Sequence, residues 1–530
     1  MPAYDRISYS KYKEIHHMMG YQDPSQENMF LYNIYLENRV RKDHPLRRIR
    51  ELVDFDFIYK EVENKYGKNG NVSVPPPTIL KLMFLFFFYN VRSERELMET
   101  IPERLDWLWF LGYTLDSPIP NHSVLSKART RWGKDVFQHF FERIVVQCVE
   151  TGLVDGAKIF VDSSLIDADA SNNSVVNKES LTRYLNERYR ELEKRLDDAA
   201  QKEPDGPKSR SDVNKRHAST TDPDASIVKQ GGKPKLFYKT HRSVDPLCEI
   251  ITAVEVTPGA INEAHKMVDL IVSHEKNTDR GVKAVVADSK YGTIDNFLSC
   301  HDKNIKAHIP FLKKTHEDKG VKKGIFSEEQ FVYDPDTNTM VCPAGKRLRK
   351  RTFHQHRQST EYIGSKKDCF SCALQPRCTK NKLGRAVHRH IHKEKLDAMV
   401  VSSRTPQAKR DIKTRQNLME RSFARGTRYG FDKARWRGLW KVNIQEYIVS
   451  AIQNIQVLIR HTHKQRRWAF ALFPNTAKTQ RWLSGEILTQ LLCRHIVRMK
   501  DACRHAFSIH PLVSCYAVQD CQPNRLGNTL

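Results

Sequence analysis

Long hydrophobic runs are missing from this chain of 530 residues. The longest unbroken apolar run, Leu82 to Tyr89, falls far short of the roughly 18 residues that a membrane-spanning helix needs. The N-terminus also lacks an apolar signal region. We therefore expect a cytoplasmic protein with no membrane partner.

Negative charge is the second shortage. Asp plus Glu number 62 against 88 Lys plus Arg, which leaves an excess of 26 positive charges. Such an excess, spread over long stretches, indicates a polyanionic partner, and nucleic acid fits it better than a membrane surface. The length also exceeds that of one ordinary domain, so we expect two or three domains.

Two apolar segments each end in an aspartate. The run 284–287 leads directly into Asp288, and the run 157–161 leads in the same way into Asp162. Short apolar runs are typical of buried strands, and chemistry in open α/β sheets gathers at the carboxyl ends of strands. For the first run alone, an aspartate that only caps the next helix is the simpler interpretation. Two such strand ends together indicate a site for hard divalent cations, which prefer oxygen ligands.

A third acid, Glu420, lies downstream in a helical and very basic segment. At this point the chain resembles the DDE transposases of bacterial insertion sequences. The resemblance covers roughly residues 25–460, and its motifs are specific in their order and spacing rather than singly. The motifs are Val161-Asp-Ser-Ser164, Ser219-Thr-Thr-Asp-Pro-Asp224, Val286-Ala-Asp-Ser-Lys-Tyr-Gly292, and Glu420-x-x-Phe423 followed by Arg437-Gly438.

The resemblance implies an RNase H-like catalytic domain in which Asp162, Asp288 and Glu420 are the catalytic acids. It also implies two Mg²⁺ ions, or Mn²⁺ in their place, that assist DNA strand cleavage and the joining of the freed 3′-hydroxyl to target DNA. The implied partner is double-stranded DNA, at the element ends and the target, bound by a homodimer in the nucleoid. Two alternatives remain open: a DNA-binding regulator without catalysis, and a nuclease of the same fold that joins no strands.

The fold class that we expect is α/β, with a mixed-sheet catalytic core, an all-helical N-terminal domain and an inserted cysteine-rich module. The expected parts are a polar segment at 1–26, a helical DNA-binding domain at 27–150, a catalytic domain at 151–312 and 396–460, the insertion at 313–395, and a basic tail at 461–530. The tail matches nothing recognisable. An accessory DNA-binding segment, a poorly ordered extension and a shifted reading frame all remain open for it.

Basic residues that could contact DNA fall in two segments. The first is a predicted helix after a proline-rich turn, and it carries Lys127, Arg129 and Arg131. A DNA-reading helix-turn-helix and a merely solvated basic helix explain it equally well. The second segment follows the glutamate, and its candidate contacts are Arg421, Arg425, Arg428 and Arg437. Relatives often place a lysine seven residues after the glutamate, where this chain has Thr427, so Arg428 could take over that phosphate contact.

Eleven cysteines are an odd number, and in a reducing compartment we expect thiols or metal ligands rather than disulfides. A CxxC pair has one further cysteine on either side, and the four are Cys342, Cys369, Cys372 and Cys378. We expect them to bind one structural Zn²⁺ ion in a closed tetrahedral site, and the resembling family often carries four cysteines here. Four unrelated thiols are the alternative, and one of His388, His390 and His392 could replace a cysteine.

Overall fold

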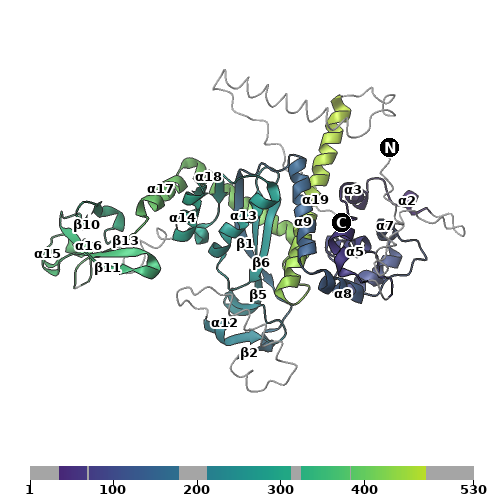
Figure 1. Ribbon diagram of the computed structural model, residues 1–530, viewed down its shortest axis with the longest axis horizontal. Coiled ribbons are helices and arrows are strands. Elements are labelled where there is room, and N and C mark those ends of the chain that lie inside the picture. Colours follow the sequence, from purple (N-terminus) through teal and green to yellow (C-terminus); the bar gives the residue numbers. More distant parts are fainter. Residues whose placement is uncertain (1–34, 68–70, 178–211, 312–323, 382, 473–530) are drawn as a thin grey trace, which may run out of the picture. The chain divides into compact units, whose positions relative to one another are not determined.

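The computed structural model describes residues 35–67, 71–177, 212–311, 324–381 and 383–472, and its elements are labelled in Figure 1. Contacts divide the chain into two units, of which residues 13–461 form one. Only the end of the last helix represents the other unit among the described residues. The predicted polar segment 1–26, the first part of the insertion (313–323) and the tail beyond residue 472 lie outside the described ranges.

The N-terminal part is helical, as expected. Its helices are α2 (Leu36–Arg39), α3 (Pro45–Leu52), α4 (Ile58–Val62), α5 (Pro76–Phe88), α6 (Glu94–Thr100), α7 (Leu105–Leu111), α8 (Ser123–Trp132) and α9 (Asp135–Glu150). Helix α5 is apolar on nearly every side and is therefore the central one. Ser93 caps α6 by accepting a hydrogen bond from the Glu96 backbone N–H at 3.1 Å. Within the described ranges, no helix combines the length and apolarity that a bilayer crossing needs.

The second part is built on a six-stranded mixed sheet. Its strands are β1 (Lys158–Asp167), β4 (Ser226–Gln230), β5 (Lys233–Asp245), β6 (Ile250–Pro258), β7 (Ala284–Val286) and β8 (Lys306–His308). The order is β4-β5-β1-β7-β8, and β6 also pairs with β5. The pairs β1–β5 and β5–β6 are antiparallel, whereas β1–β7 and β7–β8 are parallel. This mixed sheet is compatible with the RNase H-like fold that the resemblance implies.

Helices complete the second part. These are α13 (Met267–Thr278), α14 (Ile294–Asp302), α17 (Lys393–Ser403), α18 (Pro406–Thr427) and α19 (Leu439–Leu472). One continuous hydrophobic core joins this part to the N-terminal helices. Trp436, just before α19, stacks on Phe86 and meets Phe87 edge-on, with ring centroids 6.0 and 5.3 Å away. The N-terminal helices are therefore packed directly against the segment that follows Glu420.

The cysteine-rich module is a separate five-stranded antiparallel sheet with the order β13-β12-β11-β10-β9. Its elements are β9 (Val332–Asp334), β10 (Thr339–Val341), β11 (Arg347–His354), β12 (Ser359–Ile363), α15 (Lys366–Phe370), α16 (Gln375–Cys378) and β13 (Ala386–His390). A small core of its own contains Met340, Leu348, Tyr362 and Val387. Hydrophobic packing and strand pairing thus contribute to the order of this module.

Candidate active site and cysteine cluster

Asp162 and Asp288 lie on neighbouring segments, Asp162 in the middle of β1 and Asp288 two residues past the end of β7. The prediction that the first strand ends at Asp162 is wrong, because β1 continues to Asp167 in its pairing with β5. In the parallel register of β1 and β7, Phe160 is opposite Val286, so the residues two positions further on, Asp162 and Asp288, come opposite each other. Asp162 accepts a hydrogen bond from the Ser163 backbone N–H at 2.9 Å. Asp288 accepts one from the backbone N–H of Lys290 at 3.0 Å and caps the short 3₁₀ helix Ser289–Tyr291. Asp288 therefore does cap a short helix, as the simpler interpretation of its motif predicted.

The second oxygen of Asp162 is bound by an arginine. Arg415 of α18 donates from Nη1 to Asp162 Oδ2 at 3.0 Å, and the two side chains are 8% and 21% exposed. Burial raises the pKa of Asp162 to about 6, and the Arg415 guanidinium opposes that rise. Asp288 and Glu263 raise this pKa further because they are nearby negative charges. Asp162 is thus a carboxylate in an acidic neighbourhood that one cation partly neutralises.

Glu420 is not brought to this pair. It lies exposed on α18, and its carboxylate accepts a hydrogen bond from Gln416 at 3.3 Å. Five residues separate it from Arg415, which on an α-helix amounts to about 140° of rotation beyond a full turn. The two side chains therefore leave the helix in different directions. In the ranges that the structure describes, no three His, Cys, Asp or Glu side chains form a group able to hold a metal ion.

Helix α18 is fixed by polar contacts that the sequence did not suggest. Asp411 accepts a hydrogen bond from Lys158 of β1 at 3.0 Å and lies 2.7 Å from His308 of β8. Near the other end of the helix, the Ser422 carbonyl accepts a hydrogen bond from Arg242 of β5 at 3.2 Å. Together with Arg415, these contacts set the rotation of α18 about its axis, and so they set the direction of Glu420.

The Arg242 side chain belongs to a fully buried ion pair. Its Nε donates to Glu446 of α19 at 2.6 Å, and the two side chains are 0% and 1% exposed. The guanidinium also lies over the rings of Phe423 and Phe431, 4.9 and 4.7 Å from their centroids. Arg242 is directly opposite Asp162 on the adjacent strand. The pair therefore ties both helices, α18 and α19, to the sheet next to the candidate acids.

The Ser219–Asp224 motif has a structural role in this fold. Asp222 accepts hydrogen bonds from the Tyr238 hydroxyl at 2.6 Å and from the Gly438 backbone N–H at 3.1 Å. Asp224 accepts one from the backbone N–H of Leu439, the first residue of α19, at 2.8 Å. Carboxylates at a helix start satisfy its free N–H groups. Two of the motifs that carry the resemblance thus meet each other at the start of α19.

The candidate DNA contacts on α8 differ in exposure. Lys127 and Arg131 are exposed. Arg129 is 3% exposed, pairs with Glu94, and lies over the Trp436 ring 4.0 Å from its centroid. Arg129 therefore does not face solvent in this structure, because it joins the N-terminal helices to the segment before α19. We remove it from the set of proposed DNA contacts.

The candidate contacts after Glu420 are mostly paired at the surface. Arg421 and Arg425 both bind Glu249, at 2.5 and 2.6 Å. Arg437 binds Asp169 at 3.1 Å, and Arg428 is exposed. Surface ion pairs of this kind contribute little and can be exchanged for other partners. These arginines are therefore positioned where a phosphate could replace a carboxylate.

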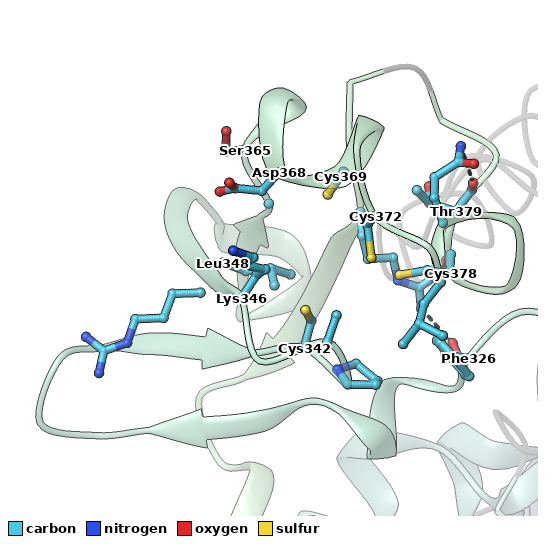
Figure 2. Close-up of a pocket in the computed structure, with 17 residues that line it drawn as sticks. Phe326, Cys342, Lys346, Leu348, Ser365, Asp368, Cys369, Cys372, Cys378 and Thr379 are labelled. Carbon is cyan, nitrogen blue, oxygen red and sulfur yellow. Dashed lines mark hydrogen bonds between the residues drawn. The ribbon is translucent and has the colours of Figure 1, made fainter.

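The four cysteines of the module line one pocket, and Figure 2 shows their sulfur atoms around it. Cys342 lies at a tight turn between β10 and β11, in which the Gly345 N–H donates to the Cys342 carbonyl at 2.8 Å and Gly345 has a φ of 74°. Cys369 lies in α15, Cys372 follows that helix, and Cys378 ends α16. Burial raises the pKa of Cys378, and the other three cysteines add to the rise because they are close. His388, His390 and His392 are not among the residues that line the pocket.

The donor set of this pocket suits zinc, because four thiolates are the usual ligands of a structural site. All four thiols are free, and each is partly exposed. In the described part of the chain, these four sulfur atoms are not arranged closely enough to hold a metal ion. The structure therefore brings the four cysteines to one pocket without arranging them as a metal site.

Comparison with protein families identifies two regions of this chain. Residues 34–131 match a transposase domain (DUF772), and residues 341–459 match a transposase DDE domain. The chain therefore carries domains of proteins that cut and move DNA, with an RNase H-like fold implied for the DDE domain. Both matches support its recognition as a DDE transposase of insertion sequences. No curated protein matches it.

The DDE match includes Glu420 and helices α18 and α19, but it begins after Asp162 and Asp288. The roles of these two aspartates rest on their motifs and on the strand register. The sequence interpretation missed Glu263, Arg415 and Glu446. Of these, only Arg415 gave a usable signal, because its spacing from Asp411 and Ser422 places the three near one face of a helix.

Proposed function

We propose that this transposase binds the ends of an insertion sequence, cuts DNA strands there and joins the freed 3′-hydroxyl to target DNA. The observation that carries the proposal is the pair of aspartates: Asp162 in β1 and Asp288 just after β7 each come two positions after the paired residues Phe160 and Val286 of these parallel strands. Two carboxylates in this relation suit Mg²⁺ or Mn²⁺, which prefer oxygen ligands. When bound, two such ions would neutralise charge on the attacking and leaving oxygens of the phosphodiester.

The protein's part in this chemistry is to hold the carboxylates and the DNA. The backbone N–H groups of Ser163 and Lys290 each fix one oxygen of an aspartate. Glu420, whose carboxylate is exposed on α18, is proposed as the third acid because of its motif and of the DDE family match that includes it. For the Glu420 carboxylate to approach the two aspartates, α18 would have to rotate and Arg415 would have to release Asp162.

The proposed DNA contacts are exposed or exchangeable cations. They are Lys127, Arg131, Arg421, Arg425, Arg428 and Arg437. Contacts of this kind release counterions from DNA, so the affinity should fall steeply as salt rises. We also propose that two copies act together on the element ends, which light scattering of the DNA complex would detect.

We propose a structural Zn²⁺ ion for Cys342, Cys369, Cys372 and Cys378. Four thiolates would fill a tetrahedral shell and leave no position for water or substrate, so this ion would take no part in strand cleavage. Its role would be to fix α15 and α16 against the β10–β11 turn. The module would then hold its shape at the point where the chain returns to α17 and α18.

A second candidate function is a DNA-binding regulator without catalysis. One observation favours it: Arg415 binds Asp162, and Glu420 is directed elsewhere. Metal-dependent cleavage of DNA that carries the element ends separates the two candidates. A wild-type protein that binds this DNA with no cleavage in Mg²⁺ or Mn²⁺ would favour the regulator.

The decisive variant is Asp288→Asn. Asparagine can still cap the 3₁₀ helix, but it removes the charge that a cation needs. We expect cleavage to fall by several orders of magnitude while DNA affinity stays the same. Asp295→Asn, an exposed position on α14, is the matched control and should retain activity. Full activity of Asp288→Asn would remove this residue from the active site.

A further inference from the structure

Glu263 is a nearly buried acid beside the two candidate catalytic aspartates. It begins the 3₁₀ turn Glu263–Lys266 after β6, and its side chain is 9% exposed. One carboxylate oxygen accepts a hydrogen bond from the Ser163 hydroxyl. The other accepts one from Lys290 Nζ at 3.0 Å and lies 3.6 Å from Lys239 Nζ. A single carboxylate therefore connects two strands of the sheet, β1 and β5, and the 3₁₀ turn after β7.

The two hydrogen-bond donors to Glu263 are also the residues that hold the aspartates. Ser163 gives its side chain to Glu263 and its backbone N–H to Asp162. Lys290 gives its ammonium group to Glu263 and its backbone N–H to Asp288. Each aspartate is thus separated from Glu263 by one residue that contacts both. A displacement of the Glu263 carboxylate would be transmitted to both aspartates.

The local backbone does not need this carboxylate. Asn262 caps the turn by accepting a hydrogen bond from the Ala264 N–H at 3.1 Å. Asn296 donates to the Ala264 carbonyl at 3.0 Å and so ties the turn to α14. Two asparagines therefore fix the backbone around Glu263, and its side chain is free for another role.

We propose that Glu263 is a positioning residue that sets the separation of the Asp162 and Asp288 carboxylates for divalent cations. This inference rests on the proposed function, because it assumes that the two aspartates bind those cations. Glu263 acts through Ser163 and Lys290 and is not itself a ligand. Lys239 and Lys290 occupy its oxygen Oε1 and keep it anionic beside two other acids.

Glu263→Gln tests the proposal with Mn²⁺ binding, measured by calorimetry on the full chain without DNA. Glutamine keeps the size of the side chain, but it can no longer accept hydrogen bonds at both ends. We expect the Kd for Mn²⁺ to rise about tenfold, with DNA affinity and Tm close to the wild-type values. Glu255→Gln is the matched control, since Glu255 lies nearby on β6 and pairs only with Lys266 at 2.9 Å in the described contacts. Its Mn²⁺ affinity should not change.

Two further variants, each of which removes one hydrogen bond to Glu263, test the proposal even if Glu263→Gln is misfolded. Ser163→Ala and Lys290→Met each remove one connection, and each should weaken Mn²⁺ binding by a few-fold. Because they act through the same carboxylate, Glu263→Gln combined with Lys290→Met should weaken it less than the product of the single effects. If Glu263→Gln does not fold, these two variants decide the question.

Each outcome either supports or overturns the proposal. Unchanged Mn²⁺ affinity in Glu263→Gln, or in both further variants, overturns it, provided that Asp288→Asn abolishes the wild-type signal. Complete loss of Mn²⁺ binding in Glu263→Gln also overturns it, because Glu263 would then be a ligand. Failure of the proposed function is distinguishable: the wild-type protein would bind Mn²⁺ through Asp288 yet would cleave no DNA. A wild-type protein with no Asp288-dependent Mn²⁺ site would contradict both.

Discussion

Replacing Glu446 by alanine should leave the Arg242 guanidinium charged and buried without its partner. Neither side chain has meaningful contact with water, at 0% and 1% exposure. Removing one partner of a buried ion pair typically lowers stability by about 3–5 kcal/mol, because the remaining charge stays desolvated. Thr240 loses its hydrogen bond to Glu446, which is 3.1 Å long, by the same change. The expected loss therefore lies toward the upper part of that range.

The assay is thermal unfolding followed by circular dichroism. A change of 1 kcal/mol shifts Tm by roughly 2–4 °C for a domain of about 150–250 residues, so we expect Tm to fall by about 10 °C or more. Arg92→Ala is the control, because Arg92 is 88% exposed and its ion pair with Glu96 should contribute less than about 1 kcal/mol. The double replacement Arg242→Met with Glu446→Met should recover most of the loss, since two apolar side chains leave no buried charge.

A Tm for Glu446→Ala within about 2 °C of the Arg92→Ala value would refute this reasoning. So would a double variant that is less stable than Glu446→Ala, because the pair would then be stabilising in its own right. The pair also holds α18 through the Ser422 carbonyl. Glu446→Ala should therefore reduce DNA cleavage as well, even at temperatures where the protein remains folded.

Three further predictions concern other parts of the molecule. Burial lowers the pKa of Lys81 to about 8, so its charge destabilises the fold below pH 8, and this effect is lost as the pH rises from 8 to 10.5. Lys81→Met should therefore raise Tm at pH 7, and the gain in Tm should shrink by pH 10. Cys369→Ser should lower the zinc content measured by elemental analysis and reduce activity indirectly, whereas Cys300→Ser, which changes a buried thiol outside the module, should do neither. A zinc content unaffected by Cys369→Ser would contradict the site. Replacing Lys127 and Arg131 together by alanine should weaken DNA binding and reduce its salt dependence; an unchanged salt slope would leave α8 as a solvated surface.

The elements with strong local patterns could be predicted from the sequence. The apolar runs before Asp162 and Asp288 lie in the strands β1 and β7, although β1 continues beyond Asp162 to Asp167, and the Ser93 cap begins α6. These features depend on residues that are neighbours in the chain, so local spacing is enough to identify them.

The direction of Glu420 could not be predicted in the same way. It depends on the rotation of α18, which Asp411 and Arg415 set through partners on β1 that are 253 positions away in sequence. Glu446 was hidden for a related reason. It lies in a helix whose apolar face predicts a plain core position, and its partner Arg242 is 204 positions away. Buried charges are stable only with a partner, and a single sequence does not show which distant residue that is.

Asp162 is held from both faces of the sheet, because successive residues of a strand point to opposite sides. On one face its Oδ2 binds Arg415 of α18, and on the other face Ser163 connects it to Glu263. A divalent cation that uses Oδ2 competes with Arg415 for the same oxygen. Glu420 lies on the same helix as Arg415, so any rotation of α18 that withdraws the arginine also moves the glutamate. A rotation of α18 that released Asp162 would therefore also change the direction of Glu420, because both Arg415 and Glu420 belong to this helix.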